Sequence, residues 1–410
     1  MSFTTLGLAP ALLHAIREQG YQAPTAIQQA AIPAVLRGAD VLGLAQTGSG
    51  KTAAFALPLL QRLMTSTSRE PRALVLAPTR ELAQQTAEVL REFARHVPQR
   101  LKISLAFGGV SINPQLMGLR GGCDVMIATP GRLLDLIEHN GLSLSNVETL
   151  VLDEADRLLD LGFADELNRI LALLPAQRQN LLFSATFAPK VEALASVLLH
   201  KPERIEVTAE PLRTEAIQQR AIHVDEAKRT PLLRHLLQSE GWTSALVFVA
   251  TKYATEHVSD KLWAHDIKAA ALHGELSQGA RTRVLMALKT GEIQVLVATD
   301  VAARGLDIPD LAAVINYDLP RAAAEYTHRI GRTGRAGATG VAVSFIPAAS
   351  EAHFRLIEKR QGRRVDREQI VGFEATEVAT EAQATGGIKG TRKSKKDKLR
   401  EAAASAQITG

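Results

Sequence analysis

Short apolar runs alternate along the chain with longer segments of helical period. Runs of Val, Ile, Leu and Ala residues end in polar residues in "ALVLAPTR", "VMIATPGR", "LVLDEAD" and "LLFSAT" of the first half, and in "ALVFVAT", "VLVATD" and "AVINYD" of the second. Such runs, separated by segments such as "TRELAQQTAEVLREFARHV", predict parallel strands that helices bury on both faces. We therefore predict a doubly wound α/β fold, in which ligands bind beyond the carboxyl ends of the strands.

The strand and helix pattern occurs twice, which predicts two domains, and a length of 410 residues fits two globular units. The strand and helix pattern is weakest around residues 207–219. We expect a first domain at 1–207, a linker at 208–217 and a second domain at 218–361. Beyond this point the apolar periodicity fades, and we expect an extension and a disordered basic tail over 362–410, because such a sequence cannot bury a core.

The composition is that of a soluble protein with cores of Ala, Leu, Ile and Val, with 46% apolar, 22% charged and 4% aromatic residues. Cys123 is the single cysteine, which excludes an intrachain disulfide and a cysteine-based zinc site and fits a reducing compartment. No uncharged apolar run reaches roughly 18 residues, and the N-terminus lacks a basic segment before a long apolar core. We therefore expect a cytoplasmic protein with neither an export signal nor a membrane span.

The net charge of +5 is local. The segment from Lys389 onward holds seven basic and two acidic residues, whereas the rest of the chain holds 41 of each. The folded part must therefore bind a polyanion through placed side chains and backbone amides rather than through bulk charge. The basic segment fits a tether for nucleic acid, and it fits a solvated, solubilising end equally well.

A phosphate-binding loop is predicted at residues 45–52, "AQTGSGKT", between an apolar run and a helical segment. Gly48 and Gly50 allow the backbone to close around phosphates, Lys51 reaches the terminal phosphates, and Thr52 can bind Mg²⁺. The pattern departs from its strict form at one point, because its first residue is alanine rather than glycine.

Adjacent carboxylates follow the run "VL" in "VLDEAD". Acidic residues at a strand end are commonly solvated or capping groups. With a phosphate loop upstream, the favoured interpretation is catalytic: Asp153 holds a metal ion, and Glu154 orients or deprotonates the attacking water.

With these motifs in place, the chain resembles the DEAD-box RNA helicases, and most closely their bacterial RhlE-type branch. The letters DEAD stand at Asp153–Asp156, and the other motifs of the family follow in order over roughly Phe3–Gly337. The resemblance implies two tandem RecA-like domains, ATP with Mg²⁺, and RNA bound across both domains. It also implies which residues bind the nucleotide, which bind RNA and which couple the two domains.

The adenine-reading segment of the family matches "GYQAPTAIQ", where Ala26 replaces the usual proline. Gln28 would pair with adenine through its amide, and this pairing would exclude guanine from the site. Phe3 would stack on the base, although a terminal Phe can also serve only as a hydrophobic cap on the first helix. Asp307 would meet the ribose. The residues implied to bind the nucleotide are Phe3, Thr25, Gln28, Gln46, Thr47, Gly48, Ser49, Gly50, Lys51, Thr52 and Asp307.

The RNA contacts implied by the family are mostly hydroxyls, glycine amides and arginines at strand ends. Such groups bind phosphate and ribose and leave base edges unread, so we expect nearly sequence-independent binding. Thr, Pro and Gly also cap helices and form turns, and their joint order carries the assignment. These residues are Pro78, Thr79, Arg80, Gly108, Gly109, Thr129, Pro130, Gly131 and Arg132 in the first domain, and Thr251, Gln278, Arg281, Thr299 and Arg304 in the second.

The segment "HRIGRTGRAG" concentrates basic residues near the end of the second domain. By resemblance, Arg332 and Arg335 are arginine fingers on the γ-phosphate, and His328 contacts the DEAD and SAT segments; Arg329 has no assigned role. The alternative is a basic turn that caps a helix or touches RNA. The residues implied to couple the two domains are Asp156, Ser184, Thr186 and His328.

The implied activity is that of an ATP-dependent RNA helicase. RNA and ATP close the two domains, hydrolysis depends on closure, and short duplexes are separated locally without translocation. An ATP-gated RNA clamp or assembly scaffold would share these motifs, and a DNA helicase or DNA-dependent ATPase is a further alternative. The motifs need one chain, so we expect a monomer, and ribosome-assembly or RNA-decay factors are the expected partners.

Overall fold

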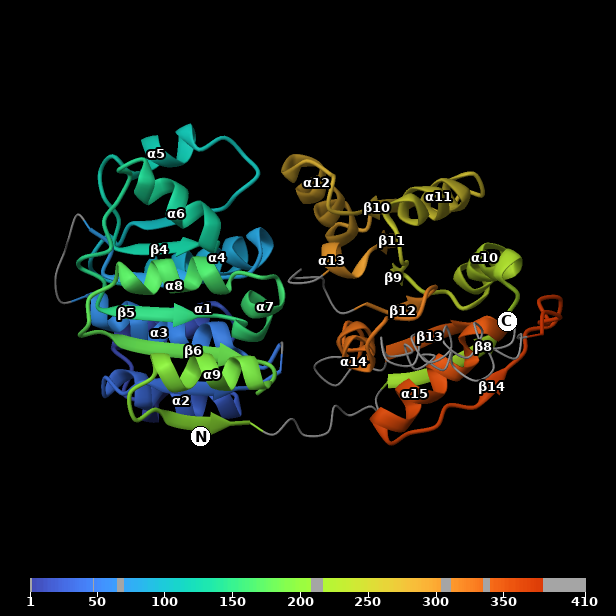
Figure 1. The fold of residues 1–410 in the computed structure, drawn as a ribbon, viewed down its shortest axis with the longest axis horizontal. Coiled ribbons are helices and arrows are strands. Elements are labelled where there is room, and N and C mark those ends of the chain that lie inside the picture. Colours follow the sequence, from blue (N-terminus) through green and yellow to red (C-terminus); the bar gives the residue numbers. More distant parts are fainter. Residues whose placement is uncertain are drawn as a thin grey trace, which may run out of the picture. The chain divides into compact units, whose positions relative to one another are not determined.

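The computed structural model describes residues 2–46, 48–64, 70–207, 217–303, 311–334 and 340–378. The chain folds into two compact units that divide near residue 211 (Figure 1). Each unit contains a parallel seven-stranded sheet flanked by helices, which confirms the predicted fold class. Within the described part of the chain, no helix combines the length and the apolar character needed to cross a membrane.

The sheet of the first unit has the strand order β3-β4-β2-β5-β6-β1-β7, and all its pairings are parallel. Its interior strands are buried along their whole length, which explains why they are largely apolar. The strands are β1 Val41–Leu44, β2 Ala73–Leu76, β3 Ile103–Ala106, β4 Val125–Ala128, β5 Thr149–Leu152, β6 Gln179–Ser184 and β7 Glu203–Glu206.

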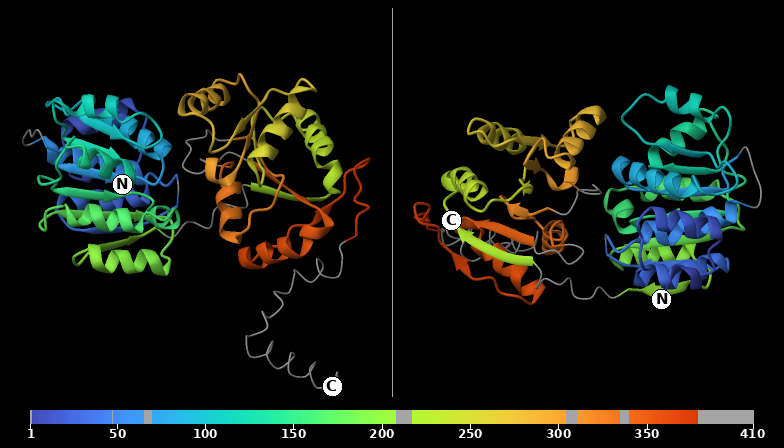
Figure 2. Two further views of the ribbon diagram at one scale, coloured as in Figure 1. Left: turned by 45° about the horizontal axis from the view of Figure 1, so that its top comes forward. Right: turned by 180° about the vertical axis from the view of Figure 1, so that it is seen from behind.

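Helices cover both faces of the first sheet and enclose two separate cores. Val75 and Val151 face the core built with α1 to α4, whereas Leu74 and Leu150 face the core built with α6 to α9. Figure 2 shows the two helical layers from further directions. The helices are η1 Phe3–Thr5, α1 Pro10–Glu18, α2 Ala26–Leu36, α3 Lys51–Leu63, α4 Arg80–Ala94, α5 Asn113–Leu119, α6 Pro130–Glu138, α7 Ala155–Asp160, α8 Ala164–Ala172 and α9 Pro189–Leu198.

The second unit repeats the arrangement with the strand order β10-β11-β9-β12-β13-β8-β14. Its strands are β8 Ile217–His223, β9 Ala245–Phe248, β10 Ala269–Leu272, β11 Val295–Ala298, β12 Ala313–Asn316, β13 Gly340–Ile346 and β14 Arg367–Glu368. Its helices are η2 Glu226–Lys228, α10 Arg229–Ser239, α11 Lys252–Trp263, α12 Gln278–Lys289, α13 Asp300–Ala303, α14 Ala323–Ile330, η3 Ala348–Ser350 and α15 Glu351–Gln361. Leu232 and Val247 lie in the core on one face of the sheet, and Tyr326 and Phe354 lie in the core on the other.

The second unit extends past the boundary at residue 361 that the sequence suggested. Strand β14 pairs with β8, and Phe373 packs against the core. The backbone N–H and hydroxyl of Thr376 donate hydrogen bonds to Asp225 at 2.8 and 2.9 Å. A two-residue strand and isolated apolar residues leave no periodic pattern, so this part of the fold depends on tertiary contacts. The basic segment from Lys389 onward lies outside the described residues.

Candidate functional site

The strand register brings the polar strand ends of the first unit to one edge of the sheet. Leu76 of β2 pairs with Ala128 of β4 and Leu152 of β5, and Leu44 of β1 pairs with Ser184 of β6. Because the strands are parallel, the segments that follow them leave the sheet on the same side. The phosphate loop, "PTR", "TPGR", "DEAD" and "SAT" therefore share this edge, as predicted.

The phosphate loop connects β1 to the first turn of α3. Gly48 and Gly50 have φ values of 85° and 90°, a region that favours glycine because it has no Cβ. Lys51 begins α3; it is buried, and its ammonium group donates a hydrogen bond to the carbonyl of Ala45 at 2.5 Å. The Ser49 hydroxyl donates to the carbonyl of Gln46 at 2.7 Å. Thr47 lies outside the described residues. A helix N-terminus behind a glycine loop is a site suited to phosphate.

Gln28 holds the adenine-reading segment against the phosphate loop. Its Oε1 accepts a hydrogen bond from the backbone N–H of Thr25 at 3.0 Å, and its Nε2 donates to the carbonyl of Gly50 at 3.1 Å. A Cβ at residue 50 would lie 2.4 Å from that Nε2, which is a second reason for glycine there. The glutamine assigned to adenine is thus buried, and it contacts the loop that would hold the phosphates.

Phe3 is buried in the core of the first unit. Its ring meets the ring of Tyr21 edge-on, with centroids 6.4 Å apart. The packing role that was the alternative for Phe3 is therefore present in the structure.

Asp153 and Glu154, which follow β5, are buried, and the backbone of Glu154 is strained. Asp153 is 2% exposed and accepts a hydrogen bond from the N–H of Glu154 at 3.0 Å. Burial, with the repulsion of Glu154, raises the pKa of Asp153 to about 7, while the charge of Lys51 opposes this shift. Glu154 is itself buried and has a φ of 48°, an uncommon conformation for a non-glycine residue that costs about 1–3 kcal/mol and clusters at functional sites. Its carboxylate forms an ion pair with Arg157.

The DEAD and SAT segments are joined within the first unit. The backbone N–H and the hydroxyl of Thr186 both donate to Asp156 Oδ2, each at 3.0 Å. The Ser184 hydroxyl donates to the carbonyl of Thr186 at 2.7 Å. The structure therefore brings together the three coupling residues predicted in this unit.

Arg80 and Arg132, which the sequence assigns to RNA binding, both lie against the loop after β3. Gly109 has a φ of 74°, and a Cβ there would lie 1.8 Å from the Arg80 guanidinium. Arg132 is 8% exposed; it donates to the carbonyl of Val110 at 2.7 Å and forms an ion pair with Asp135. Arg132 thus shapes the loop after β3, a positioning role that its sequence motif does not reveal.

The threonines and Pro130 of these segments stand at helix starts. Thr79 is the N-cap of α4, and its hydroxyl accepts a hydrogen bond from the N–H of Leu82 at 3.3 Å. Thr129 is the N-cap of α6, and Pro130 is the first residue of that helix. Their capping roles were the alternative interpretation, and the two interpretations are compatible because helix starts also present amides to anions.

The residues of the second unit that are assigned to RNA also lie at helix starts or directly after strands. Thr251 is the N-cap of α11, Gln278 begins α12, and Thr299 follows β11. Arg281 is 8% exposed, and its guanidinium donates to backbone carbonyls of His273 and Ala302, each at 3.4 Å. Arg304 and Asp307 lie outside the described residues.

Arg329, which the sequence left without a role, is the centre of a buried network. It is 3% exposed and donates two hydrogen bonds to the carboxylate of Asp300, each at 2.6 Å. The same guanidinium donates to Asn316 Oδ1 at 3.0 Å and to the carbonyl of Asp318 at 2.6 Å, and it lies 4.7 Å from the centroid of the Phe248 ring. It therefore links the arginine-rich segment to the ends of three strands.

The two arginines assigned to the γ-phosphate fall at the edge of the described region. Arg332 is half-buried after α14, and its carbonyl accepts a hydrogen bond from the N–H of Leu311 at 3.3 Å. His328 is exposed on α14. Arg335 lies outside the described residues.

Comparisons with known proteins match both units. The family model for DEAD/DEAH box helicases matches residues 25–194, and that for the helicase conserved C-terminal domain matches residues 227–337. A curated relative, the ATP-dependent RNA helicase DeaD of Mycobacterium tuberculosis, is 45% identical over 90% of this chain, which spans 65% of that relative's length. The DEAD-box ATP-dependent RNA helicase CshA of Bacillus cereus is 42% identical, over 89% of this chain and 69% of the relative.

Among solved structures, Saccharomyces cerevisiae Dbp5 bound to RNA and ADP BeF3 is 34% identical with a TM-score of 0.78, over 90% of this chain and 95% of that one. The motifs from Thr25 to Thr186 lie within the first matched range, and those from Thr251 to Arg335 lie within the second. The chain belongs to the family of DEAD-box ATP-dependent RNA helicases.

Proposed function

We propose that this protein is an ATP-dependent RNA helicase that hydrolyses ATP when RNA is bound and separates short duplexes locally. The observation that carries the proposal is the shared sheet edge of the first unit. There the phosphate loop, with Lys51 at the start of α3, lies close enough to Asp153 for its charge to oppose the rise in the carboxyl pKa. Cytoplasmic location, a monomeric state and the RhlE-type branch belong to the same proposal.

The nucleotide is held by the groups of the loop and the adenine-reading segment. Backbone amides of residues 46–52 and the Lys51 ammonium bind the phosphates. Gln28 meets adenine, Phe3 lies against the base, and Asp307 meets the ribose. Because Gln28 already contacts the carbonyl of Gly50, adenine binding and the shape of the loop are coupled.

The carboxylates fit a divalent cation. Asp153 is buried beside Glu154, and a nearby Mg²⁺ would favour its ionised form and so oppose the burial and the repulsion by Glu154 that raise its pKa. Asp153 and Thr52 offer the oxygen ligands that Mg²⁺ prefers. When bound with ATP, the ion neutralises phosphate charge. Glu154 orients or deprotonates the attacking water.

RNA contacts come from hydroxyls, amides and arginines at the strand ends of both units, and they bind the sugar-phosphate backbone. Arg132 and Arg281 are buried, so in this proposal they act by shaping the loops that contact RNA. Arg332 and Arg335 approach the γ-phosphate when RNA closes the domains, and His328 meets the pair formed by Asp156 and Thr186. Partners in ribosome assembly or RNA decay fit a remodelling activity of this kind.

The deciding experiment is steady-state ATP hydrolysis measured without nucleic acid, with single-stranded RNA, and with DNA of the same sequence. Lys51→Ala provides the background rate. We expect RNA-selective stimulation, since ribose 2′-hydroxyl contacts distinguish RNA from DNA. Equal rates in all three conditions would refute RNA-dependent closure. Strand displacement of a short duplex is measured in parallel, and stimulated hydrolysis without displacement would identify an ATP-gated clamp instead.

A further inference from the structure

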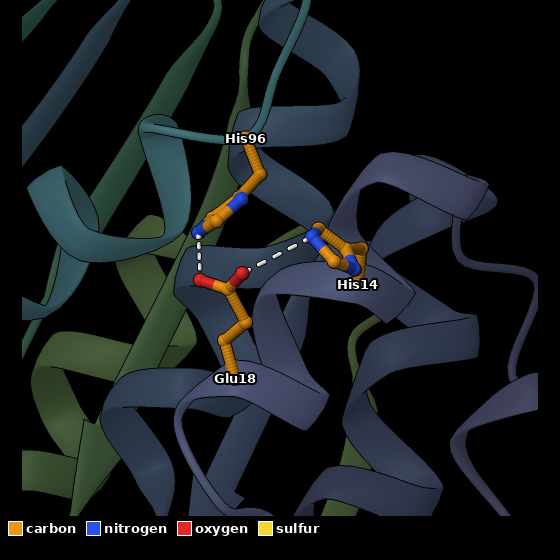
Figure 3. Close-up of side chains that lie close together, drawn as sticks. All are labelled: His14, Glu18 and His96. Atoms are coloured by element: carbon orange, nitrogen blue, oxygen red, sulfur yellow. Dashed lines mark ion pairs between the residues drawn. The ribbon is translucent and has the colours of Figure 1, made fainter.

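Three side chains converge on the surface of the first unit: His14, Glu18 and His96 (Figure 3). Glu18 lies between the two histidines. Its Oε1 is 3.2 Å from His14 Nε2, and its Oε2 is 3.2 Å from His96 Nε2. The ligand atoms of the three residues all lie within 4.8 Å of one another. Among the residues that the structure describes, this is the one such group of three histidines, cysteines or carboxylates.

Two helices position the group. His14 and Glu18 are four residues apart on α1 and therefore project from the same face of that helix. His96 follows the end of α4, so it reaches the group from a segment about eighty residues away in sequence. The two imidazole rings are 5.1 Å apart between centroids and meet edge-on, with an interplanar angle of 81°.

The Glu18 carboxylate pairs with the two histidines, while the polar groups beside it pair with another carboxylate. The other nearby carboxylate, Glu92, accepts hydrogen bonds from Gln19 Nε2 at 3.3 Å and from Arg95 Nη1 at 2.7 Å. The side chain of His96 is 18% exposed, whereas those of Glu18 and His14 are 53% and 60% exposed. The cluster is thus anchored on one side and open to water on the other.

We propose that His14, Glu18 and His96 form a binding site for a divalent transition-metal ion, with Zn²⁺ as the representative ion. Zn²⁺ bonds of about 2.0–2.2 Å to nitrogen and oxygen in a tetrahedron place ligand atoms roughly 3.3 Å apart. Each histidine Nε2 already lies 3.2 Å from one oxygen of Glu18, His14 from Oε1 and His96 from Oε2, and the three ligand atoms lie within 4.8 Å of one another. Two imidazoles and one carboxylate bind the ion, and water completes its coordination on the open side. Imidazole ligands favour Zn²⁺, Co²⁺ or Ni²⁺ over the Mg²⁺ proposed for the nucleotide site.

A bound ion would cross-link α1 to the end of α4. Helix α1 leads into the segment that carries Gln28, and α4 begins at Arg80, which the proposed function assigns to RNA. The ion would therefore brace the helix before the adenine-reading segment against the far end of the helix that starts at the RNA contact. This consequence rests on the proposed function, whereas metal binding itself is independent of it and is tested without nucleotide or RNA.

The test is a titration of the full-length, nucleotide-free protein with Co²⁺ and then Zn²⁺ in a buffer that contains excess Mg²⁺, so that carboxylate sites are filled. We expect saturable binding of one Co²⁺, seen as visible absorption bands of a histidine-bound ion, and displacement by Zn²⁺. His14→Ala and His96→Ala should each weaken Zn²⁺ binding by at least about tenfold, because loss of even an outer-shell partner typically costs 10–100-fold. Glu18→Gln, which keeps the side-chain length but removes the charge and replaces one acceptor oxygen with an amide NH2 group, should weaken it likewise.

The matched control is His139→Asn, which changes an exposed histidine of the same unit whose Nδ1 lies 2.7 Å from the carbonyl of Asp135. This variant should keep the wild-type affinity. A second measurement follows thermal unfolding by circular dichroism. Zn²⁺ at about 100 times the wild-type Kd should raise the unfolding temperature by roughly 5 °C, and a tenfold or greater loss of affinity in His96→Ala should reduce this shift to about half or less.

Two results would overturn the proposal. Equal Zn²⁺ affinity in the wild type and in the doubly substituted His14→Ala, His96→Ala protein would place the ion elsewhere. Failure of the wild type to bind Co²⁺ or Zn²⁺ saturably would leave the cluster as a carboxylate shared by two histidines.

Discussion

Replacing Arg329 with alanine should destabilise the second unit far more than removal of an exposed ion pair would. Arg329 is 3% exposed and donates two charge-assisted hydrogen bonds to Asp300. It also satisfies the Oδ1 atom of Asn316, a residue that is fully buried. The side chain of Asp300 is 25% exposed, so water can replace part of what that carboxylate loses.

The expected magnitude follows from these contacts. An acceptor left unsatisfied in the interior, here Asn316 Oδ1, costs about 1–3 kcal/mol. Breaking a buried pair by removing one partner costs about 3–5 kcal/mol in total. We therefore expect Arg329→Ala to lower the free energy of unfolding of the second unit by about 3–5 kcal/mol. Arg329→Lys should recover only part of this loss, because an ammonium group cannot reproduce the planar fork of donors.

The assay is urea unfolding followed by tryptophan fluorescence. Both tryptophans of the chain, Trp242 and Trp263, belong to the second unit, so the signal reports that unit selectively. The control is Arg355→Ala, which removes an exposed pair with Glu351 at 2.8 Å; that glutamate keeps its contact with Arg367. We expect a loss of roughly 0.5 kcal/mol or less for the control. A loss below about 1 kcal/mol for Arg329→Ala, with an unchanged urea slope, would refute the assignment of Arg329 as the central link of the network.

Three further predictions concern the proposed catalytic groups. Arg335→Ala should lower RNA-stimulated ATP turnover by ~10³-fold or more while leaving ATP binding largely intact, and a loss below about tenfold at saturating RNA would contradict the arginine-finger role. Glu154→Gln should trap a complex with ATP and RNA, measured as a longer RNA residence time; an unchanged residence time would argue against Glu154 as the group that orients water. Burial raises the pKa of Asp153 from 3.8 to about 7, so its contribution to the stability of the nucleotide-free protein is present below pH 3.8 and is lost as the pH rises through 7. Asp153→Asn should therefore reduce the fall in unfolding temperature over this pH range, and a pH profile identical to that of the wild type would show that Asp153 ionises without cost.

The sheet architecture could be predicted because burial on both faces requires apolar runs in the interior strands, such as β2, β4, β9 and β11. The polar residues at the run ends could be predicted as a site because parallel strands share one edge. The chain beyond residue 361 could not be placed in this way, since β14 has two residues and, of the described apolar residues in the segment, only Val365, Ile370 and Phe373 pack against the cores. Their burial depends on a surface that exists only once the second sheet has formed.

The sequence by itself determined which chemical groups follow each strand, and hence the phosphate loop, the DEAD carboxylates and the arginine-rich segment. Only the tertiary structure decided how these groups are used, because burial and pairing depend on neighbours that are distant in sequence. In the arginine-rich segment it selected Arg329 as the buried partner of Asp300. The tertiary structure also buries Arg132 and places His96 beside Glu18. A motif specifies that a side chain is present, whereas the surrounding dielectric and the geometry of its partners determine whether it can reach a ligand or is held by the fold.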